Sequence, residues 1–328
     1  MEKMRRGIKD LPALFRSPAF RKNFKEKLME VVFFIAACAS ILAVTLICVF
    51  IFQGGWNAVK EVGLAEFLGG TKWKPTADNP SFGIFPMIMG SIYVTGGALI
   101  IGVPIGILTA VFMARFCPKW LHRWLKPAFE LLAGIPSIVY GFFGLMVLVP
   151  LVRQFFPGDG NSMFTAWILL GIMVLPTIIS ISEAALRAVP ESYYEGALAL
   201  GASHERAVFK TIVPAAKSGI LAGVVLGIGR VIGETMALIW VCGNQPRLPD
   251  SIFEGVRTMT TNIVLEMGYA TGLHRQTLIA TGAVLFGLLA LAVGIASVAM
   301  EQSVQNICAC VIPLVYFICA VSVKAGRA

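Results

Sequence analysis

The most telling segment of this chain reads Glu195-Gly-Ala-Leu-Ala-Leu-Gly201-Ala-Ser-His-Glu-Arg-Ala-Val-Phe-Lys-Thr-Ile-Val-Pro214, a polar insert between two strongly apolar stretches. Helix-forming residues precede Gly201, which permits a backbone turn that a side chain would resist. Ser203 can cap a second helix that runs to Val213, where Pro214 interrupts the pattern. The sequence therefore predicts two short helices around a bend at Gly201.

Composition places the chain among polytopic α-helical membrane proteins. It is 57% hydrophobic and only 14% charged, with a mean hydropathy of +0.80, which lies outside the range of soluble domains. A helix needs about 20 apolar residues to cross a bilayer, and no segment alternates with the period of two that a barrel strand requires. The predicted spans are 31–52, 84–113, 129–152, 164–182, 218–242 and 277–299.

These spans divide the chain into three regions. Residues 1–30 form a basic N-terminal segment, residues 31–299 a transmembrane domain with a polar loop at 183–217, and residues 300–328 an apolar C-terminal extension. Within the extension, 307–323 is near the lower length limit for a span. A seventh helix, an interfacial helix and a sequence altered near its end are equally compatible with this segment.

The distribution of Lys and Arg predicts the orientation of the chain. These residues are dense before the first span, in the connector at 114–128 and in the loop at 183–217, and sparser for their length in the alternate connectors. Because basic loops are retained on the cytoplasmic side, we expect the N-terminus and the insert to lie in the cytoplasm. The formal charge of +9 follows from this topology, and nucleic-acid binding is not needed to account for it.

The residue pattern argues against an enzyme. The sequence contains no G-x-x-x-x-G-K-[ST] motif and not one Gly-Lys dipeptide, so this chain cannot bind ATP by the P-loop route. No Ser/His/Asp or Cys/His arrangement can be assembled for catalysis. His122, His204 and His274 fall in separate connectors, and the cysteines lie mostly inside apolar runs. We therefore expect no catalytic residue, no metal site and no cofactor on this chain, and any ATP must be bound by a partner.

The sharpest chemical signal lies in the fifth predicted span, Gly227-Ile-Gly-Arg230-Val-Ile-Gly-Glu234-Thr235-Met-Ala. A charge at the centre of a span costs roughly 3 kcal/mol on insertion scales unless it is compensated. Glu234 follows Arg230 by one helical turn, so it can pair with Arg230 on the same face. One interpretation is a buried ion pair that fixes helix packing. The other is a polar station on a translocation path, where Glu234 competes with an anion for Arg230 and weakens its grip.

The insert resembles the cytoplasmic coupling motif, the EAA loop, of binding-protein-dependent ABC importer permeases. Two positions depart from the usual pattern, with Gly196 where Ala is common and Thr211 where Ile is common. The alternative is an ordinary helix-turn-helix connector between spans. The resemblance implies contact with a partner ATPase through Glu195, Gly196, Ala197, Gly201 and Pro214.

A more specific resemblance extends from about residue 31 to residue 299. Three segments are similar to phosphate-uptake ABC permease subunits of the PstC type: Arg230-Val-Ile-Gly-Glu-Thr-Met-Ala237 followed by Gly243-Asn244, Glu130-Leu-Leu-Ala-Gly-Ile-Pro-Ser-Ile-Val-Tyr-Gly141, and Gly272-Leu-His-Arg275. Met236-Ala237 favours this subunit over its PstA-type sister, where Ala-Pro is more usual. After about residue 300 the resemblance stops.

The PstC-type resemblance implies a type I ABC importer permease fold with six core helices, in the cytoplasmic membrane of a prokaryote. It implies a PstA-type sister permease, a PstB-type ATPase dimer that holds ATP and magnesium, and a PstS-type phosphate-binding protein. It also places Arg230, Glu234 and Thr235 on the translocation pathway. Two alternatives remain open, which are a permease for another oxyanion such as sulfate or molybdate, and a secondary carrier that works alone.

Overall fold

The computed structural model describes the backbone of residues 18–299, so the predicted segment 307–323 and the first part of 1–30 lie outside the described residues. The chain divides into two units, Met1–Gly54 and Gly55–Ala328. The first unit is described by helix α3, which begins at Pro18 and ends at Val62 in the second unit. Phe33 and Phe34 are among its many exposed apolar side chains, as expected for a helix surface suited to lipid.

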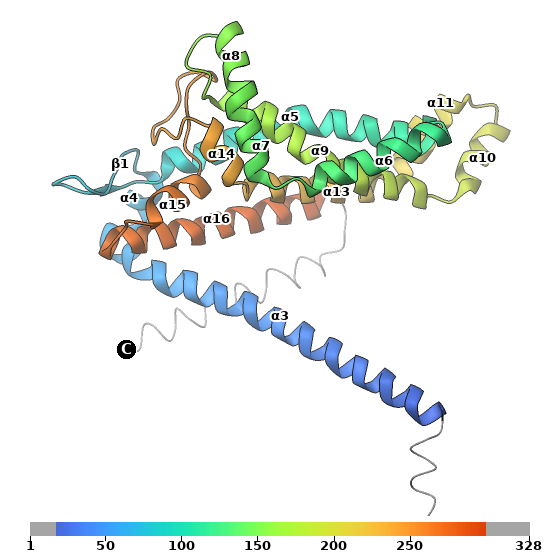
Figure 1. Cartoon of the computed structure of the whole chain (residues 1–328), viewed down its shortest axis with the longest axis horizontal. Coiled ribbons are helices and arrows are strands. Elements are labelled where there is room, and N and C mark those ends of the chain that lie inside the picture. The colour runs from blue at the N-terminus through green and yellow to red at the C-terminus, as the bar shows by residue number, and fades with distance from the viewer. Residues whose placement is uncertain (1–17, 300–328) are drawn as a thin grey trace, which may run out of the picture. The chain divides into compact units, whose positions relative to one another are not determined.

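The described part of the second unit, residues 55–299, consists of helices, one short hairpin and the loops between them (Figure 1). Its elements are α4 (Leu64–Gly69), β1 (Trp73–Lys74), β2 (Ser81–Phe82), α5 (Phe85–Val111), η1 (Phe112–Phe116), α6 (Lys119–Gly134), α7 (Ser137–Phe143), η2 (Gly144–Leu148), α8 (Val149–Phe155), α9 (Met163–Ala188), α10 (Glu191–Ala199), α11 (His204–Ala207), η3 (Val208–Ile212), α12 (Val213–Ala215), α13 (Lys217–Ile232), α14 (Met236–Val241), α15 (Met259–Met267) and α16 (Gly272–Ala299). The segments η1, η2 and η3 are single turns of π-helix within longer helices.

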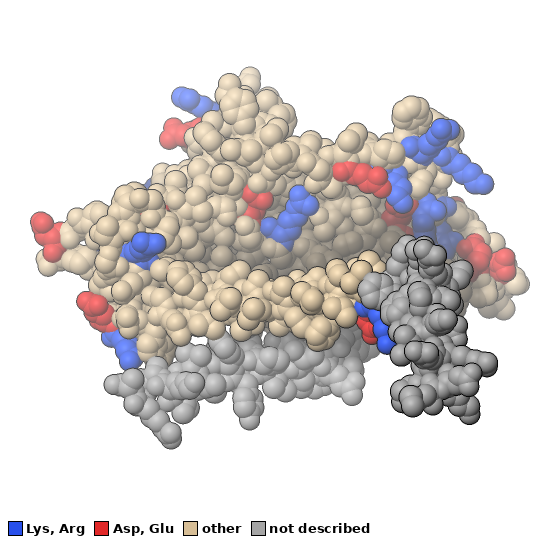
Figure 2. Space-filling model, turned by 60° about the horizontal axis from the view of Figure 1, so that its bottom comes forward, with Lys and Arg blue, Asp and Glu red and all other residues tan. Residues whose placement is uncertain are grey.

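The predicted membrane fold is confirmed. Among the described residues, five helices are long and apolar enough to cross a membrane, and a bent helix pair makes a sixth. The five are Glu26–Val62, Phe85–Phe116, Ser137–Phe155, Met163–Ala188 and Gly272–Ile295, and the pair is His204–Ala215 with Lys217–Ile232. Charged side chains gather toward the two ends of the view in Figure 2, and few interrupt the surface between them.

The centre of the second unit is α9, which packs against α5 and α13 through glycines. A Cβ atom added at Gly102 of α5 would lie 2.5 Å from Val174, and one at Gly227 of α13 would lie 2.9 Å from the same side chain. On the α5 side, a Cβ at Gly97 would overlap the Trp167 ring. Small residues let helix backbones approach closely, which is how helices associate in lipid without a hydrophobic driving force.

The third predicted span, 129–152, is wrong at its start. Residues up to Gly134 belong to α6, a separate helix with no buried residue, and the apolar span begins at Ser137 and ends at Phe155. The break has a local cause, because Pro136 disfavours helical geometry at the preceding residue. Ile135 accordingly has φ −68° and ψ 126°, in the extended region.

The two ends of the second unit carry different structures (Figure 1). The hairpin, α4 and α15 lie at one end, and α10 and α11 lie at the other. The first end has its own apolar core, in which Phe67, Trp73, Phe82, Met259 and Leu278 are buried. The insert thus lies far from the hairpin, with the long helices between them.

The close contact between α5 and α9 predicts a sharp difference between two adjacent glycines. Gly97→Ala would press on the Trp167 ring, which is held by a 2.9 Å hydrogen bond from its Nε1 to the Tyr93 carbonyl. We expect the free energy of unfolding to fall by about 1–3 kcal/mol, because the added methyl group overpacks this interface. Gly96→Ala is the control, because a Cβ there meets nothing within 4 Å. Thermal unfolding in detergent should show a lower midpoint for Gly97→Ala alone, and equal midpoints would contradict close packing here.

Candidate functional site

The first half of the insert is a helix that ends as the sequence predicts. α10 ends at Ala199, Gly201 adopts φ +84°, and the chain leaves the helix there. The Ala202 amide donates to the Ala197 carbonyl at 3.1 Å, and the Gly201 amide donates to the Leu198 carbonyl at 2.9 Å. These two bonds form a Schellman motif, which satisfies the last carbonyls of a helix and favours glycine at the left-handed position.

The second half of the insert is longer and more irregular than predicted. Ser203 caps it, since its hydroxyl accepts from the Arg206 amide at 3.4 Å. The helix then passes through the π-turn η3 and ends at Ala215, two residues beyond the predicted end at Val213. Pro214 lies inside the final turn instead of ending the helix. The chain bends by 67° between this segment and α13, so the insert is joined directly to a membrane helix.

The outward surface of the insert is open for contact with another molecule. Glu195, Gly196 and Gly201 are exposed, and α10 has no buried residue. Leu200, which follows α10, is 91% exposed, so a large apolar side chain is available on this surface. A Cβ atom at Gly196 or Gly201 would meet nothing within 4 Å. Of the predicted coupling residues, Ala197 is half-buried and Pro214 is exposed.

The inward surface of the insert is fixed to the helix bundle. Val208 and Ile212 are fully buried in a core that includes Val111 of α5 and Leu186 of α9. This apolar contact seats the second half of the insert on the ends of two membrane helices.

Polar contacts reinforce that seat. The Arg115 guanidinium donates to the Glu191 carboxylate at 2.8 Å and lies 5.9 Å from the centre of the Tyr194 ring. The Tyr194 hydroxyl lies 2.7 Å from His204 Nδ1, which links α10 to α11. The sequence does not indicate these partners, because Arg115 is one of several basic residues in the connector at 114–128 and Tyr194 has no distinguishing spacing.

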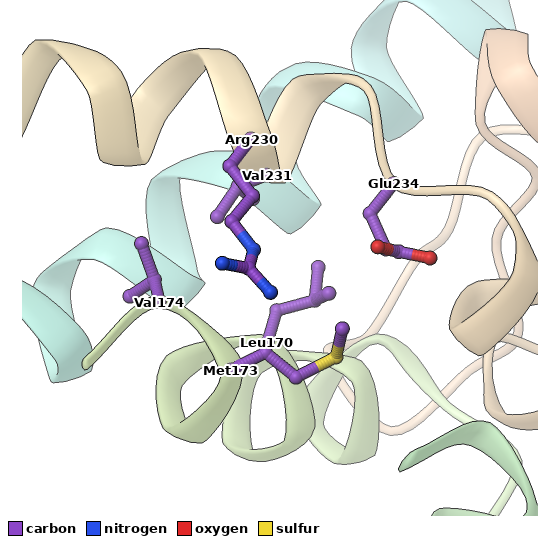
Figure 3. A pocket seen from close by; sticks show the side chains of 6 residues that line it. All are labelled: Leu170, Met173, Val174, Arg230, Val231 and Glu234. Carbon is purple, nitrogen blue, oxygen red and sulfur yellow. The ribbon is translucent and has the colours of Figure 1, made fainter. Parts of the chain in front are cut away.

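The predicted ion pair between Arg230 and Glu234 is wrong. α13 ends at Ile232, and the chain is not helical from Gly233 to Thr235, so the two residues do not share a helical face. Figure 3 shows the Arg230 guanidinium directed between α13 and α9, with the Glu234 carboxylate apart from it. Arg230 Nη1 donates instead to the Thr177 hydroxyl on α9, at 3.1 Å.

Glu234 has partners of its own at the start of α14. Its Oε1 accepts from the Thr235 amide at 3.1 Å and from the Ala237 amide at 3.2 Å. A carboxylate is favourable at this position because the first amides of a helix lack partners within the helix and carry a partial positive charge. Thr235, also predicted on the pathway, donates its hydroxyl to the Gly233 carbonyl at 3.3 Å.

Arg230 and Glu234 line one narrow pocket together with Leu170, Met173, Val174 and Val231 (Figure 3). The space between these side chains has no room for a water molecule. The structure therefore brings both charged residues to one site and keeps the site closed. Among the described residues, no group of three His, Cys, Asp or Glu side chains is arranged to hold a metal ion.

The three histidines lie in separate polar clusters. His122 Nε2 lies 2.7 Å from Glu183, which also accepts from Arg187 and is only 4% exposed at the end of α9. His274 Nε2 lies 2.9 Å from the buried Glu266. The sequence does not indicate the pairing of His122 with Glu183 or of Trp73 with Glu266, since these partners are 61 and 193 residues apart in the chain.

Comparison with known proteins points to one family. Residues 102–306 match the model of the binding-protein-dependent transport system inner membrane component. The chain is 42% identical over 258 residues to the probable ABC transporter permease protein YqgH of Bacillus subtilis, covering 76% of this chain and 84% of that protein. It is 35% identical over 292 residues to the phosphate transport system permease protein PstC of Haemophilus influenzae, covering 81% and 91%.

A solved structure shares the fold. A bacterial alginate ABC transporter, crystallised with an alginate pentasaccharide-bound periplasmic protein, matches with a TM-score of 0.58. The match covers 85% of this chain and 97% of that chain at 15% sequence identity. At this identity the likeness shows the fold alone.

The left-handed conformation at Gly201 predicts how the insert responds to substitution. Gly201→Val should strain the turn by about 1–2 kcal/mol, because a β-branched residue at positive φ is disfavoured. Gly201→Asn should be tolerated better, since Asn adopts this region more readily. Hydrogen exchange at the Ala202 amide should quicken in the Val variant and change little in the Asn variant. Gly196→Ala is the control for a side chain added near the turn. Equal exchange rates at the Ala202 amide in all variants would contradict the predicted strain at Gly201.

Proposed function

The chain belongs to the family of binding-protein-dependent transport system inner membrane components, and we infer that it is the PstC-type permease subunit of an ATP-driven inorganic phosphate importer. The observation that supports phosphate as the substrate is the similarity to a phosphate transport permease over 91% of that protein's length. The chain is a transport subunit of a prokaryotic cytoplasmic membrane and not an enzyme.

The importer needs partners that supply what this chain lacks. A PstA-type sister permease completes the pathway, and a PstS-type binding protein delivers phosphate from outside. A PstB-type ATPase dimer binds ATP and magnesium, because this sequence has no phosphate-binding loop. The exposed face of α10 is available to contact this ATPase, and the dense basic residues of 1–30 and 183–217 support a cytoplasmic N-terminus and insert.

The insert and Arg230 are connected through one bent helical segment. The second half of the insert continues through the 67° bend into α13, and Arg230 lies in the last turn of α13 at its other end. Because the insert is also seated on α5 and α9, movement of the ATPase shifts several helices together. We expect this movement to alternate the access of the pathway between the two sides of the membrane, as in a two-state transporter.

Arg230 is suited to brief contact with an oxyanion. Its recorded partner among the described residues is the neutral Thr177 hydroxyl, so most of its five N–H donors are uncommitted. A guanidinium binds phosphate oxygens in a bidentate manner. Glu234, on the nearby break between α13 and α14, adds a negative charge to the same pocket that opposes tight retention of an anion. The site is therefore built to pass phosphate and not to store it.

Neutralising Arg230 tests the pathway role. In proteoliposomes that contain the complete transporter, Arg230→Gln should lower phosphate uptake by at least about tenfold, the loss of one charged hydrogen bond. Co-purification of the partners should persist, and Arg153→Gln on α8 should transport normally. Loss of assembly in Arg230→Gln would instead assign Arg230 to packing. Sulfate and molybdate uptake in the same vesicles tests the other substrates.

Reversing the charge of the insert tests its contact with the ATPase. Glu195→Lys should leave membrane insertion unchanged but reduce uptake and its dependence on ATP hydrolysis, since Glu195 is exposed on α10. Asp159→Lys makes the same charge change at an exposed residue outside the insert and should behave as the unmodified chain. Full coupling in Glu195→Lys would exclude Glu195 from the contact. Uptake by the purified chain without an ATPase would favour the self-sufficient carrier.

A further inference from the structure

Two cavities share a wall at the hairpin end of the second unit. The larger, of about 590 Å³, is lined by Thr71, Lys72, Trp73, Lys74, Gln245, Pro246 and Arg247. The smaller, of about 350 Å³, is lined by Trp73, Lys74, Pro75, Thr76, Ala77, Pro246, Arg257, Glu266 and Tyr269. We call the two together the basic vestibule. Both volumes fall within the range of ligand pockets, about 300–1,000 Å³.

The lining of the basic vestibule carries an excess of positive charge. Its cations are Lys72, Lys74, Arg247 and Arg257, and its one carboxylate is Glu266. Glu266 is already neutralised, because its Oε1 accepts from Arg257 Nη1 at 2.6 Å. Arg247 forms a looser pair with Glu254, at 3.6 Å. No ion pair is recorded for Lys72 or Lys74 with any of the described residues, so these two lysines supply the uncompensated charge.

A buried carboxylate anchors the side chain that lies between the two lysines in the sequence. Trp73 lies between them on the β1 segment, is 5% exposed, and donates from Nε1 to Glu266 Oε2 at 2.9 Å. Glu266, itself 6% exposed, also contacts His274 Nε2 at 2.9 Å. Trp73 lines both cavities together with Lys74, and Lys72 lines the larger one, so the anchored indole forms part of the wall beside the two lysines.

The backbone around the hairpin is equally constrained. The Gly83 amide donates to the Lys72 carbonyl at 3.0 Å, and the Phe85 amide donates to the Gly70 carbonyl at 3.2 Å. A Cβ atom at Gly83 would lie 2.3 Å from the Gly70 backbone. The backbone that carries the two exposed lysines is therefore held by the hairpin, which reduces the backbone entropy that is lost when a ligand binds.

The basic vestibule is connected to the break that carries Glu234. Arg257 Nε donates to the Asn244 carbonyl at 2.9 Å, on the segment that follows α14. The Thr260 hydroxyl donates to the Glu234 carbonyl at 3.0 Å. The hairpin whose β1 carries Trp73 and Lys74 lies at the end of the second unit away from the insert (Figure 1), which is the outer end if the insert faces the cytoplasm.

We propose that the basic vestibule is an outer binding site for a small hydrated oxyanion, which holds phosphate after its release and before it reaches Arg230. This inference rests on the proposed function. The cations line two open hollows of about 590 and 350 Å³, which have room for a small hydrated ion, and docking of an acidic protein surface is the alternative that the first test separates. A cleft lined by one sign of charge raises the local concentration of the opposite ion and its rate of entry.

The first test separates an ion site from a protein-docking surface by transport kinetics. The complete transporter in proteoliposomes is supplied with phosphate-loaded binding protein, and the double variant Lys72→Gln/Lys74→Gln is compared with Lys60→Gln/Arg153→Gln, which removes two exposed cations elsewhere. We expect the maximal uptake rate of the first variant to fall by about tenfold, with an unchanged half-saturating concentration of binding protein. A raised half-saturating concentration at full maximal rate would overturn the proposal and assign the lysines to protein docking.

The second test measures anion binding directly and does not depend on transport. Inorganic phosphate added to the detergent-solubilised transporter complex without binding protein should show broadened ³¹P resonances. The broadening should fall several-fold in Lys72→Gln/Lys74→Gln and persist in Arg230→Gln and in the control pair. Equal broadening in all variants would refute the basic vestibule. Failure of the unmodified transporter to take up phosphate, with the ³¹P broadening intact, would instead refute the proposed function.

Discussion

The close approach of α5 and α13 to α9 is the contact on which the rest of the structure depends. Glycines replace side chains along both interfaces, so Val174 of α9 is touched from both sides. In lipid the association of helices relies on van der Waals contact and on polar pairs, and here the contact is close enough that a methyl group would disturb it. α9 also supplies Thr177 to Arg230 and Leu186 to the seat of the insert. One packed helix thus supports both functional regions.

The break between α13 and α14 resolves the difficulty of placing two charges in an apolar helix. Arg230 lies in the last turn of α13 and donates to Thr177, and Glu234 accepts from the first amides of α14. Each charge is stabilised by the end of a helix, an effect of about 0.3–1 kcal/mol for an exposed group and more when partly buried. Arg230 and Glu234 do not pair with each other, although their spacing in the sequence suggests it. Arg230 therefore retains N–H donors for a passing anion.

Two kinds of polar structure occupy the two ends of the second unit. At one end the insert combines an exposed outer face with an inner face fixed by Arg115, Tyr194 and buried apolar residues. At the other end Glu266 joins Trp73, Arg257 and His274 in one buried network beneath the basic vestibule. A rigid attachment at each end suits a transporter whose helices move as packed bodies, since a loose loop would absorb the displacement.

The sequence by itself determined the membrane class, most spans, the bend at Gly201 and the family, because these depend on local properties: hydropathy over about 20 residues, glycine at positive φ and short motifs. It predicted Arg230 and Glu234 as the charged site but not their geometry, since an uninterrupted helix was assumed where Gly233–Thr235 break it. The break at Ile135–Pro136 carried a local signal, yet the apolar run concealed where the third span begins. Only the tertiary structure joined Trp73 to Glu266 and His122 to Glu183. Those partners are brought together by packing of distant segments, and no spacing along one helix or strand encodes them.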